Sequence, residues 1–300
     1  MEQPGLTETV RLRLGDAVRG LLVGSEIADV STFSEPLGDP GLLGPDSVAW
    51  RVHGDIGSLV GGVRALLLQT MHPLAMAGVA EHSDYKNDPF GRLQRTAGYI
   101  GVTTFANTAA AQQMIAKVRS VHEHVHGTAP DGRCYSATDP ELLRWVHATE
   151  VDSFLTSVQA FGSAQLSRDD ADRYLREMSV IGAAMGATRV PTTEREMRAY
   201  WREVRPELRA GTQAREAARW LVSPPLPLAG RPAYAVLLAA AVGTLPGHVR
   251  RALRLPRVPV VDTLAVRPAA RALVRVLGWS LGESPIAEAA AARAAGTPLG

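Results

Sequence analysis

The stretch IGSLVGGVRALLLQTMHPLAMAGV, residues 56–79, is the first long apolar segment of the chain. Its apolar side chains recur on nearly every side of a helical projection, which is typical of a helix buried in the core. Pro73 cannot donate a backbone hydrogen bond and disfavours the helical conformation in the residue before it. The stretch therefore predicts a buried helical segment that is broken or kinked just after His72.

Helix signals continue through the rest of the chain. Asn87-Asp88-Pro89 is a cap followed by proline at a first helical position, and residues 127–132 (GTAPDG) form a strong turn signal. No segment alternates with period two, and no glycine-rich nucleotide-binding motif is present. The pattern predicts an all-α fold, a single globular helical domain. The expected helices span residues 10–22, 89–104, 108–126, 140–161, 167–182, 192–208, 213–222, 231–245, 247–254 and 265–278.

Three regions are expected along the chain. Residues 1–50, with the glycine- and proline-rich run EPLGDPG at 35–41, are expected to form a peripheral arm. Residues 51–285 are expected to form the helical domain. Residues 286–300 are alanine-rich, end in GTPLG and are expected to be a frayed tail.

Composition limits the classes of partner. The 32 basic and 30 acidic residues give a formal net charge of +2, which offers no strong electrostatic case for nucleic acid. The one cysteine, Cys134, excludes an internal disulfide framework and fits a reducing compartment. The N-terminus shows no export signal, and no apolar run reaches the roughly 20 residues that span a bilayer. We expect a cytoplasmic protein.

His122 is the first candidate metal ligand. Val118 and Val125 flank it on the apolar stripe of the expected helix at 108–126, so the imidazole should point inward. A buried neutral imidazole needs a partner for its ring nitrogens. That partner is either a metal or a backbone carbonyl, and position alone leaves both open.

A second hypothesis uses the same residue. His122-Glu123-His124-Val125-His126 matches H-E-x-x-H, which on a helix places two histidines on one face with a glutamate as general base for zinc hydrolysis. Gly127 ends the helix at once and no third ligand pattern follows. Zinc hydrolysis therefore stays an alternative.

The helix expected at 89–104 carries a polar face. Arg92, Arg95 and Thr96 lie on it at helical spacing, together with Tyr99 and Thr103. Such a face is either solvated or a polar wall over a bound anion or oxygen species, because arginine supplies fixed cationic donors and threonine a hydroxyl.

His72 and Glu81 lie at the two ends of the segment that Pro73 begins. Each could reach a pocket where the chain breaks. A carboxylate beside an apolar cavity can serve as a base, although a capping or surface role fits Glu81 equally. His147 is expected to be buried, in a structural role or bonded to a carboxylate or another imidazole.

Eight short stretches resemble one family when they are taken in order. The set is similar to the bacterial branch of the MpaB and rubber-oxygenase (latex-clearing protein) catalytic-domain family, over about residues 45–275. The stretches are 61–69 (GGVRALLLQ), 71–75 (MHPLA), 78–83 (GVAEHS), 88–96 (DPFGRLQRT), 117–122 (KVRSVH), 135–137 (YSA), 139–141 (DPE) and 145–149 (WVHAT).

The resemblance implies an all-α fold around a buried pocket for one b-type haem. Its proximal ligand is a histidine after a basic residue, and Arg119-Ser120-Val121-His122 matches that pattern. The iron ligand is therefore expected at His122. The family's distal Arg-x-x-x-Thr pair is matched by Arg92 and Thr96.

Further positions follow from the same resemblance. Arg95 stands where rubber oxygenases carry a lysine before the threonine, so lysine capping of the iron is not expected. Glu81 is the nearest in order to the catalytic glutamate. His72 and Arg95 are expected to border the cofactor.

The resulting expectation is a haem b-dependent oxygenase or related oxidoreductase that uses dioxygen on a small apolar, isoprenoid- or lipid-like substrate. The alternatives are a non-catalytic protein that binds haem or an apolar ligand, the zinc hydrolase, and a helical scaffold with structural histidines. Apolar helices beside arginines in the C-terminal third also fit weak association with an anionic membrane surface, although a core face and a solvated face explain the pattern better.

Overall fold

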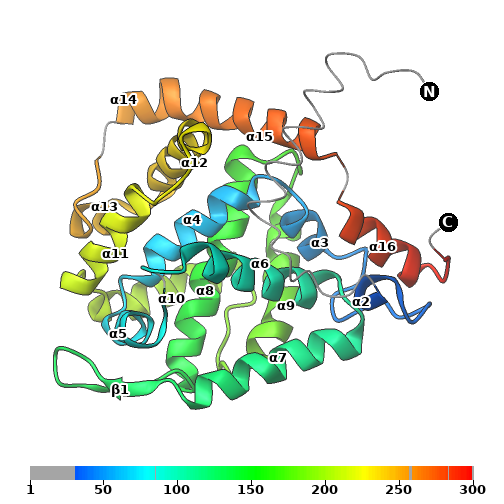
Figure 1. Cartoon of the computed structure of the whole chain (residues 1–300), viewed down its shortest axis with the longest axis horizontal. Coiled ribbons are helices and arrows are strands. Elements are labelled where there is room, and N and C mark those ends of the chain that lie inside the picture. Colours follow the sequence, from blue (N-terminus) through cyan, green and yellow to red (C-terminus); the bar gives the residue numbers. More distant parts are fainter. Residues whose placement is uncertain (1–30, 85, 257–258, 283, 299–300) are drawn as a thin grey trace.

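The computed structural model describes residues 31–84, 86–256, 259–282 and 284–298. Over these residues the chain forms a mainly helical single domain, which confirms the predicted all-α class (Figure 1). The helix expected at 10–22 lies outside the described residues.

The elements follow the expected order closely. In chain order they are α2 (Ser31–Ser34), α3 (Val48–His53), α4 (Ser58–Gln69), α5 (Pro73–His82), α6 (Pro89–Phe105), α7 (Thr108–Glu123), β1 (His126–Thr128), β2 (Cys134–Ser136), α8 (Pro140–Phe161), α9 (Arg168–Met185), α10 (Glu194–Val204), η1 (Arg205–Glu207), α11 (Thr212–Val222), η2 (Leu228–Gly230), α12 (Arg231–Thr244), α13 (Gly247–Ala252), α14 (Pro259–Val261), η3 (Asp262–Val266), α15 (Arg267–Leu281) and α16 (Pro285–Ala294).

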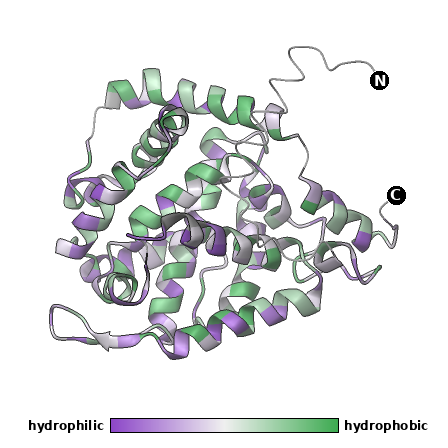
Figure 2. Ribbon diagram, in the orientation of Figure 1, coloured by the Kyte–Doolittle hydropathy of each residue, from purple (hydrophilic) through white to green (hydrophobic). Residues whose placement is uncertain are grey.

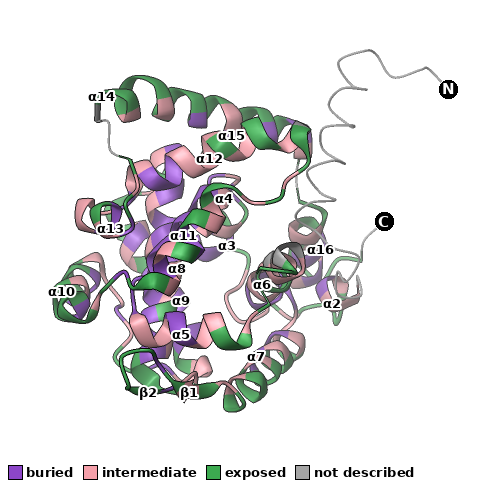
Figure 3. Ribbon diagram, turned by 60° about the vertical axis from the view of Figure 1, so that its left-hand side comes forward, coloured by how far each residue is buried: buried purple, intermediate pink, exposed green. Residues whose placement is uncertain are grey.

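Helix α8 forms the centre of the core, and α4 packs directly against it (Figure 3). Gly61 permits this approach, since a Cβ at that position would lie 2.9 Å from the Cα of Phe154. The buried Arg64 of α4 also donates to Asp152 of α8 at 2.9 Å. The apolar stretch at 56–79 thus supplies two core helices, and the break predicted at Pro73 is confirmed.

The C-terminal helices add outer layers. Helix α12 packs against α4, and α15 packs against α12 at the edge of the molecule (Figure 1). Apolar and polar residues alternate along α15, and part of the apolar set faces outward (Figure 2).

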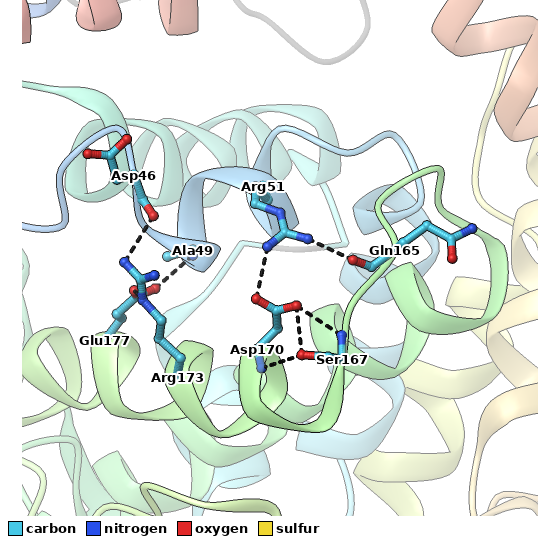
Figure 4. A network of polar contacts seen from close by, with 8 residues as sticks. All are labelled: Asp46, Ala49, Arg51, Gln165, Ser167, Asp170, Arg173 and Glu177. Carbon is cyan, nitrogen blue, oxygen red and sulfur yellow. Dashed lines mark hydrogen bonds and ion pairs between the residues drawn. The ribbon is translucent and has the colours of Figure 1, made fainter.

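A polar network fixes α3 against α9 (Figure 4). Arg51 donates to Asp170 at 2.9 Å, and Glu177 accepts the backbone N–H of Ala49 at 2.9 Å. Arg173 holds Glu177 in place at 2.8 Å. The network sets the position of the last residue of α3, which belongs to the interior cluster described below.

The region after α7 differs from the sequence prediction. The helix expected to reach residue 126 ends at Glu123, and His126–Thr128 pairs antiparallel with Cys134–Ser136. Strands of three residues are too short to show an alternating pattern, so only their connecting turn was predicted.

The C-terminal segment also differs from the frayed end expected from residue 286. Pro285–Ala294 forms α16, which packs on α2, and its Arg293 is fully buried. Burial of an arginine with partners in the domain holds this helix in place, a tertiary effect that alanine-rich composition does not reveal.

Candidate functional site

His122 lies in the last turn of α7, half-buried. Its Nδ1 is buried and makes no hydrogen bond within the described residues. Burial lowers the pKa of His122 below its ordinary value, so the ring is neutral near pH 7. A neutral imidazole with an unpaired buried nitrogen is chemically suited to ligate a metal.

His126 is not on the same helical face as His122. The chain turns at His124, and His126 is an exposed residue of β1 whose carbonyl faces His82. The paired-ligand geometry of H-E-x-x-H needs both histidines on one helix. Among the described residues no group of three or more His, Cys, Asp or Glu side chains is placed to hold a metal ion.

Helix α6 carries the residues that were expected to share one polar face, but the structure divides them: Arg95 and Thr96 are exposed, whereas Thr103 is buried and Tyr99 packs against the core. The helix runs opposite to α7 and packs against it, so the start of α6 and the end of α7 lie on the same side of the molecule (Figure 1). Arg92 is half-buried and donates to the Ser83 hydroxyl at 3.0 Å. The exposed Thr96 donates to the carbonyl of Arg92 at 3.0 Å. Arg92 and Thr96 thus lie one turn apart in the N-terminal half of α6.

Arg95 points elsewhere. Its side chain is 62% exposed and forms an ion pair with Asp88 at 3.2 Å, across the first turn of α6. Asp88 is also the N-cap of α6, where it accepts the N–H of Gly91. In this arrangement Arg95 supports the helix start.

Glu81, the expected base, is part of a contact between α5 and the hairpin. It is exposed and accepts a short hydrogen bond from the hydroxyl of the buried Tyr135 on β2. His82 Nε2 lies 3.1 Å from the same hydroxyl. Burial, followed by the hydrogen bond to Glu81, raises the pKa of Tyr135 to about 12, so the phenol keeps its proton.

His72 occupies the N-cap position of α5 and is 7% exposed. Its Nδ1 is buried without a hydrogen-bond partner in the described part of the chain, and its ring lies 5.8 Å from that of Trp145. Burial, with a smaller effect of Arg133, lowers the pKa of His72. It is therefore a second neutral imidazole with an unpaired buried nitrogen.

A second polar group lies deep between α3, α6 and α9. His53 Nδ1 lies 2.7 Å from the Thr104 hydroxyl, and His53 Nε2 lies 2.9 Å from the Tyr174 hydroxyl. Burial, with a smaller contribution from repulsion by His147, lowers the pKa of His53 to about 4. The ring is therefore neutral and can donate from one nitrogen while it accepts at the other.

Glu150 of α8 faces the same interior. Burial raises its pKa to about 7, and its charge in turn helps to raise the pKa of both Tyr99 and Tyr174. His147, one turn earlier on α8, has its pKa lowered to about 4 by burial. A Cβ on Gly182 would lie 2.9 Å from His147 Nε2, so glycine there leaves room for the ring.

Sequence reasoning placed His147 in the interior but did not identify His53 or Glu150 as part of a cluster. Glu150 shares a face of α8 with Leu143, His147 and Phe154, and a carboxylate at such a position was an available signal. His53 carried no comparable signal, because its partners are 51 and 121 residues away in the chain.

The comparisons with known proteins identify one family. Residues 50–279 match the model described as ER-bound oxygenase mpaB/B'/Rubber oxygenase, catalytic domain. Neither the curated proteins nor the solved structures gave a match. The family model covers most of the chain, including α4 to α13 and nearly all of α15. The chain therefore belongs to the mpaB and rubber oxygenase catalytic-domain family.

Proposed function

We propose that this protein is a haem b-dependent oxygenase or related oxidoreductase that uses dioxygen on a small apolar, isoprenoid- or lipid-like substrate. The observation that carries the proposal is His122, a neutral imidazole with a buried, unpaired Nδ1 at the end of α7, within an oxygenase catalytic domain. The rubber oxygenases named in the family support an apolar substrate.

The residues present fit a haem group. His122 would hold the iron, and Arg92 and Thr96 of α6 would offer polar groups to the bound cofactor. His72 offers a further buried nitrogen without a partner, whereas Arg95 is engaged with Asp88. When bound, haem supplies one-electron and dioxygen chemistry, and the protein supplies the ligand, the orientation and the exclusion of water.

The donors on α6 have a defined electrostatic task. Arg92 carries a permanent positive charge on a planar guanidinium, and one of its N–H groups donates to Ser83. Charge that develops on oxygen during the reaction is stabilised by such preorganised donors. The Thr96 hydroxyl donates to the Arg92 carbonyl and keeps lone pairs free to accept a hydrogen bond.

Two carboxylates are candidates to move protons. Glu81 was expected to act as the base, and its Oε2 accepts a hydrogen bond from the Tyr135 hydroxyl. The proton stays on Tyr135, because the pKa of this phenol is about 12. Glu150 has a pKa of about 7, so its carboxyl group can hold or release a proton near neutral pH.

Haem binding is tested by titrating the purified protein with haem and recording its absorption spectrum. We expect wild type to bind one haem with a strong Soret band, and His122→Ala to lose the ligand-dependent spectrum while its circular dichroism stays helical. His126→Ala is the matched control, since His126 is exposed on β1. Full haem content and an unchanged ferric spectrum in His122→Ala would show the axial assignment to be wrong.

Turnover is tested separately. Oxygen uptake by the haem-loaded protein is measured with a short isoprenoid alkene and with its saturated analogue. We expect uptake with the alkene only. Haem binding without uptake on either compound would instead support a non-catalytic haem-binding protein.

A further inference from the structure

A cavity of about 160 Å³ lies beneath the start of α15, between α12, α13 and η3. It is more than roughly ten times the space that one water molecule requires. Its lining is polar and basic, with the arginines Arg250 and Arg267, the threonines Thr244 and Thr263, and Asp262 among the contributing residues. None of these belongs to the site proposed for haem.

The charged side chains that line the cavity are two arginines and one aspartate, so one positive charge is not balanced within the lining. Arg250 is 8% exposed and donates from Nη1 to Asp262 at 2.9 Å, while its Nε is buried without a partner within the described residues. Arg267 is exposed and takes part in no ion pair with another described residue. Two guanidinium groups face one carboxylate, so the cavity is suited to an anion with several acceptor oxygens.

The backbone beside the cavity is a π-helix, η3, which continues directly into α15. π-Helical turns are rare in proteins, and those that occur are often found at functional sites. This turn directs Asp262 and Thr263 to the cavity, while the next residue, Leu264, is 73% exposed. The cavity and an outward apolar surface therefore meet at one turn.

That apolar surface continues along the outermost helix. Helix α15 buries one face through Ala270, Val274 and Leu277. The opposite side stays exposed, as the colouring of α15 in Figure 3 shows. We call this set the outer stripe: Val260 (65% exposed), Val261 (48%), Leu264 (73%), Val276 (47%) and Trp279 (47%).

A row of arginines accompanies the outer stripe. Arg267, Arg271 and Arg275 are four residues apart, so they lie along one flank of α15. All three are exposed, and residues 263–281 contain no acidic side chain. Within the described part of the chain none of the three forms an ion pair, although Arg271 donates to the carbonyl of Ala160. The helix surface is therefore apolar and cationic together.

We propose that this face of the protein docks on an anionic phospholipid surface, with a lipid phosphate in the cavity between Arg250 and Arg267 and the outer stripe against the acyl chains. Interfacial helices combine an apolar stripe, flanking Lys or Arg and a tryptophan at the boundary in this way. A second copy of the chain is a poorer occupant. In an antiparallel two-fold contact of two α15 helices the arginine rows would lie on the same flank and repel each other.

The test is binding to vesicles of phosphatidylcholine alone and of phosphatidylcholine with phosphatidylglycerol, followed by sedimentation and tryptophan fluorescence. Of the five tryptophans, Trp279 alone has an exposed side chain, so its insertion shifts the emission to shorter wavelength. We expect wild type to bind only the anionic vesicles. Arg267→Gln should weaken binding about fivefold, the effect of roughly one arginine at a membrane surface. Leu264→Asp should abolish the emission shift.

Matched controls come from α9. Val180→Asp and Arg176→Gln change an exposed valine and an exposed arginine there, and both variants should bind like wild type. Binding that is absent, or equal on neutral vesicles, would overturn the proposal. So would saturation of the site by free glycerol phosphate with no vesicle binding. A dimer in solution that Leu264→Asp dissociates would instead assign this face to a second copy of the chain.

Discussion

His53 Nε2 lies 2.9 Å from the hydroxyl oxygen of Tyr174, and this contact joins the end of α3 to the middle of α9. The other ring nitrogen, Nδ1, lies 2.7 Å from the Thr104 hydroxyl of α6. With the pKa of His53 at about 4, the ring is neutral, so both nitrogens are satisfied without burying a charge. One imidazole thus ties three helices together in the interior.

We predict that Tyr174→Phe lowers the free energy of unfolding by about 1–3 kcal/mol, because it leaves a buried ring nitrogen of His53 without its partner. Urea denaturation followed by circular dichroism measures the change. Tyr99→Phe is the control, since no described residue hydrogen-bonds the Tyr99 hydroxyl. A loss in Tyr174→Phe no larger than in Tyr99→Phe would mean that the contact adds nothing to stability.

The raised pKa of Glu150 should make the stability of the protein depend on pH. Its pKa is about 7 in the folded protein, above the ordinary value, so the folded state binds the proton more tightly than the unfolded state. Stability from this group is complete below the unfolded pKa and falls as pH rises toward 7. Glu150→Gln cannot ionise, so its stability relative to wild type should improve from pH 5 to pH 8, by on the order of 2 kcal/mol.

The comparison with wild type is needed because two histidines act in the opposite direction. The pKa values of His53 and His147 are lowered to about 4, so their contribution is lost as pH falls from about 6.5 through 4. Wild type and Glu150→Gln both keep these two histidines, so the effect of the histidines cancels when the two proteins are compared. Parallel pH profiles for wild type and Glu150→Gln would contradict a raised pKa at Glu150.

Most of the helical framework could be predicted because its signals are local. Pro73 ends one core helix and starts another, and Asp139 with Pro140 begins α8 at the predicted residue. The hairpin at β1 and β2 and the helix α16 could not be predicted in the same way. The hairpin is too short for a periodic pattern, and α16 is held by Arg293 through contacts with distant parts of the chain.

The candidate site could be predicted only in part. His122 and His147 lie on apolar helix faces, and periodicity alone indicates that such side chains point inward. Glu81 and Glu150 show what sequence order and periodicity do not reveal. Order along the chain favoured Glu81, which is exposed, whereas the carboxylate whose pKa is strongly raised is Glu150, whose burial is created by the packing of other helices, α9 among them, on α8.

We predict that Arg92→Gln lowers the rate of oxygen uptake at least tenfold while haem content changes little. Removing one preorganised donor typically costs about 100-fold or more in rate, and the half-buried position of Arg92 reduces that effect. Uptake is measured per bound haem, so loss of cofactor is separated from loss of turnover. Arg176→Gln, at an exposed position of α9, is the control. If Arg92→Gln keeps the wild-type rate of oxygen uptake, Arg92 belongs to a solvated surface of α6 and has no part in the reaction.

The last prediction concerns Arg293, which is fully buried and donates to four carbonyl oxygens. Two of them, those of Phe105 and Ala106, belong to the C-terminal end of α6, where helix carbonyls lack partners and carry partial negative charge. Arg293→Met would leave these carbonyls unsatisfied and should lower the free energy of unfolding by about 3 kcal/mol or more. Hydrogen exchange should also quicken across α16 and the last turn of α6, whereas Arg195→Met, at an exposed position of α10, should leave it unchanged. Unaltered exchange in Arg293→Met would show that apolar packing alone holds α16 on the domain.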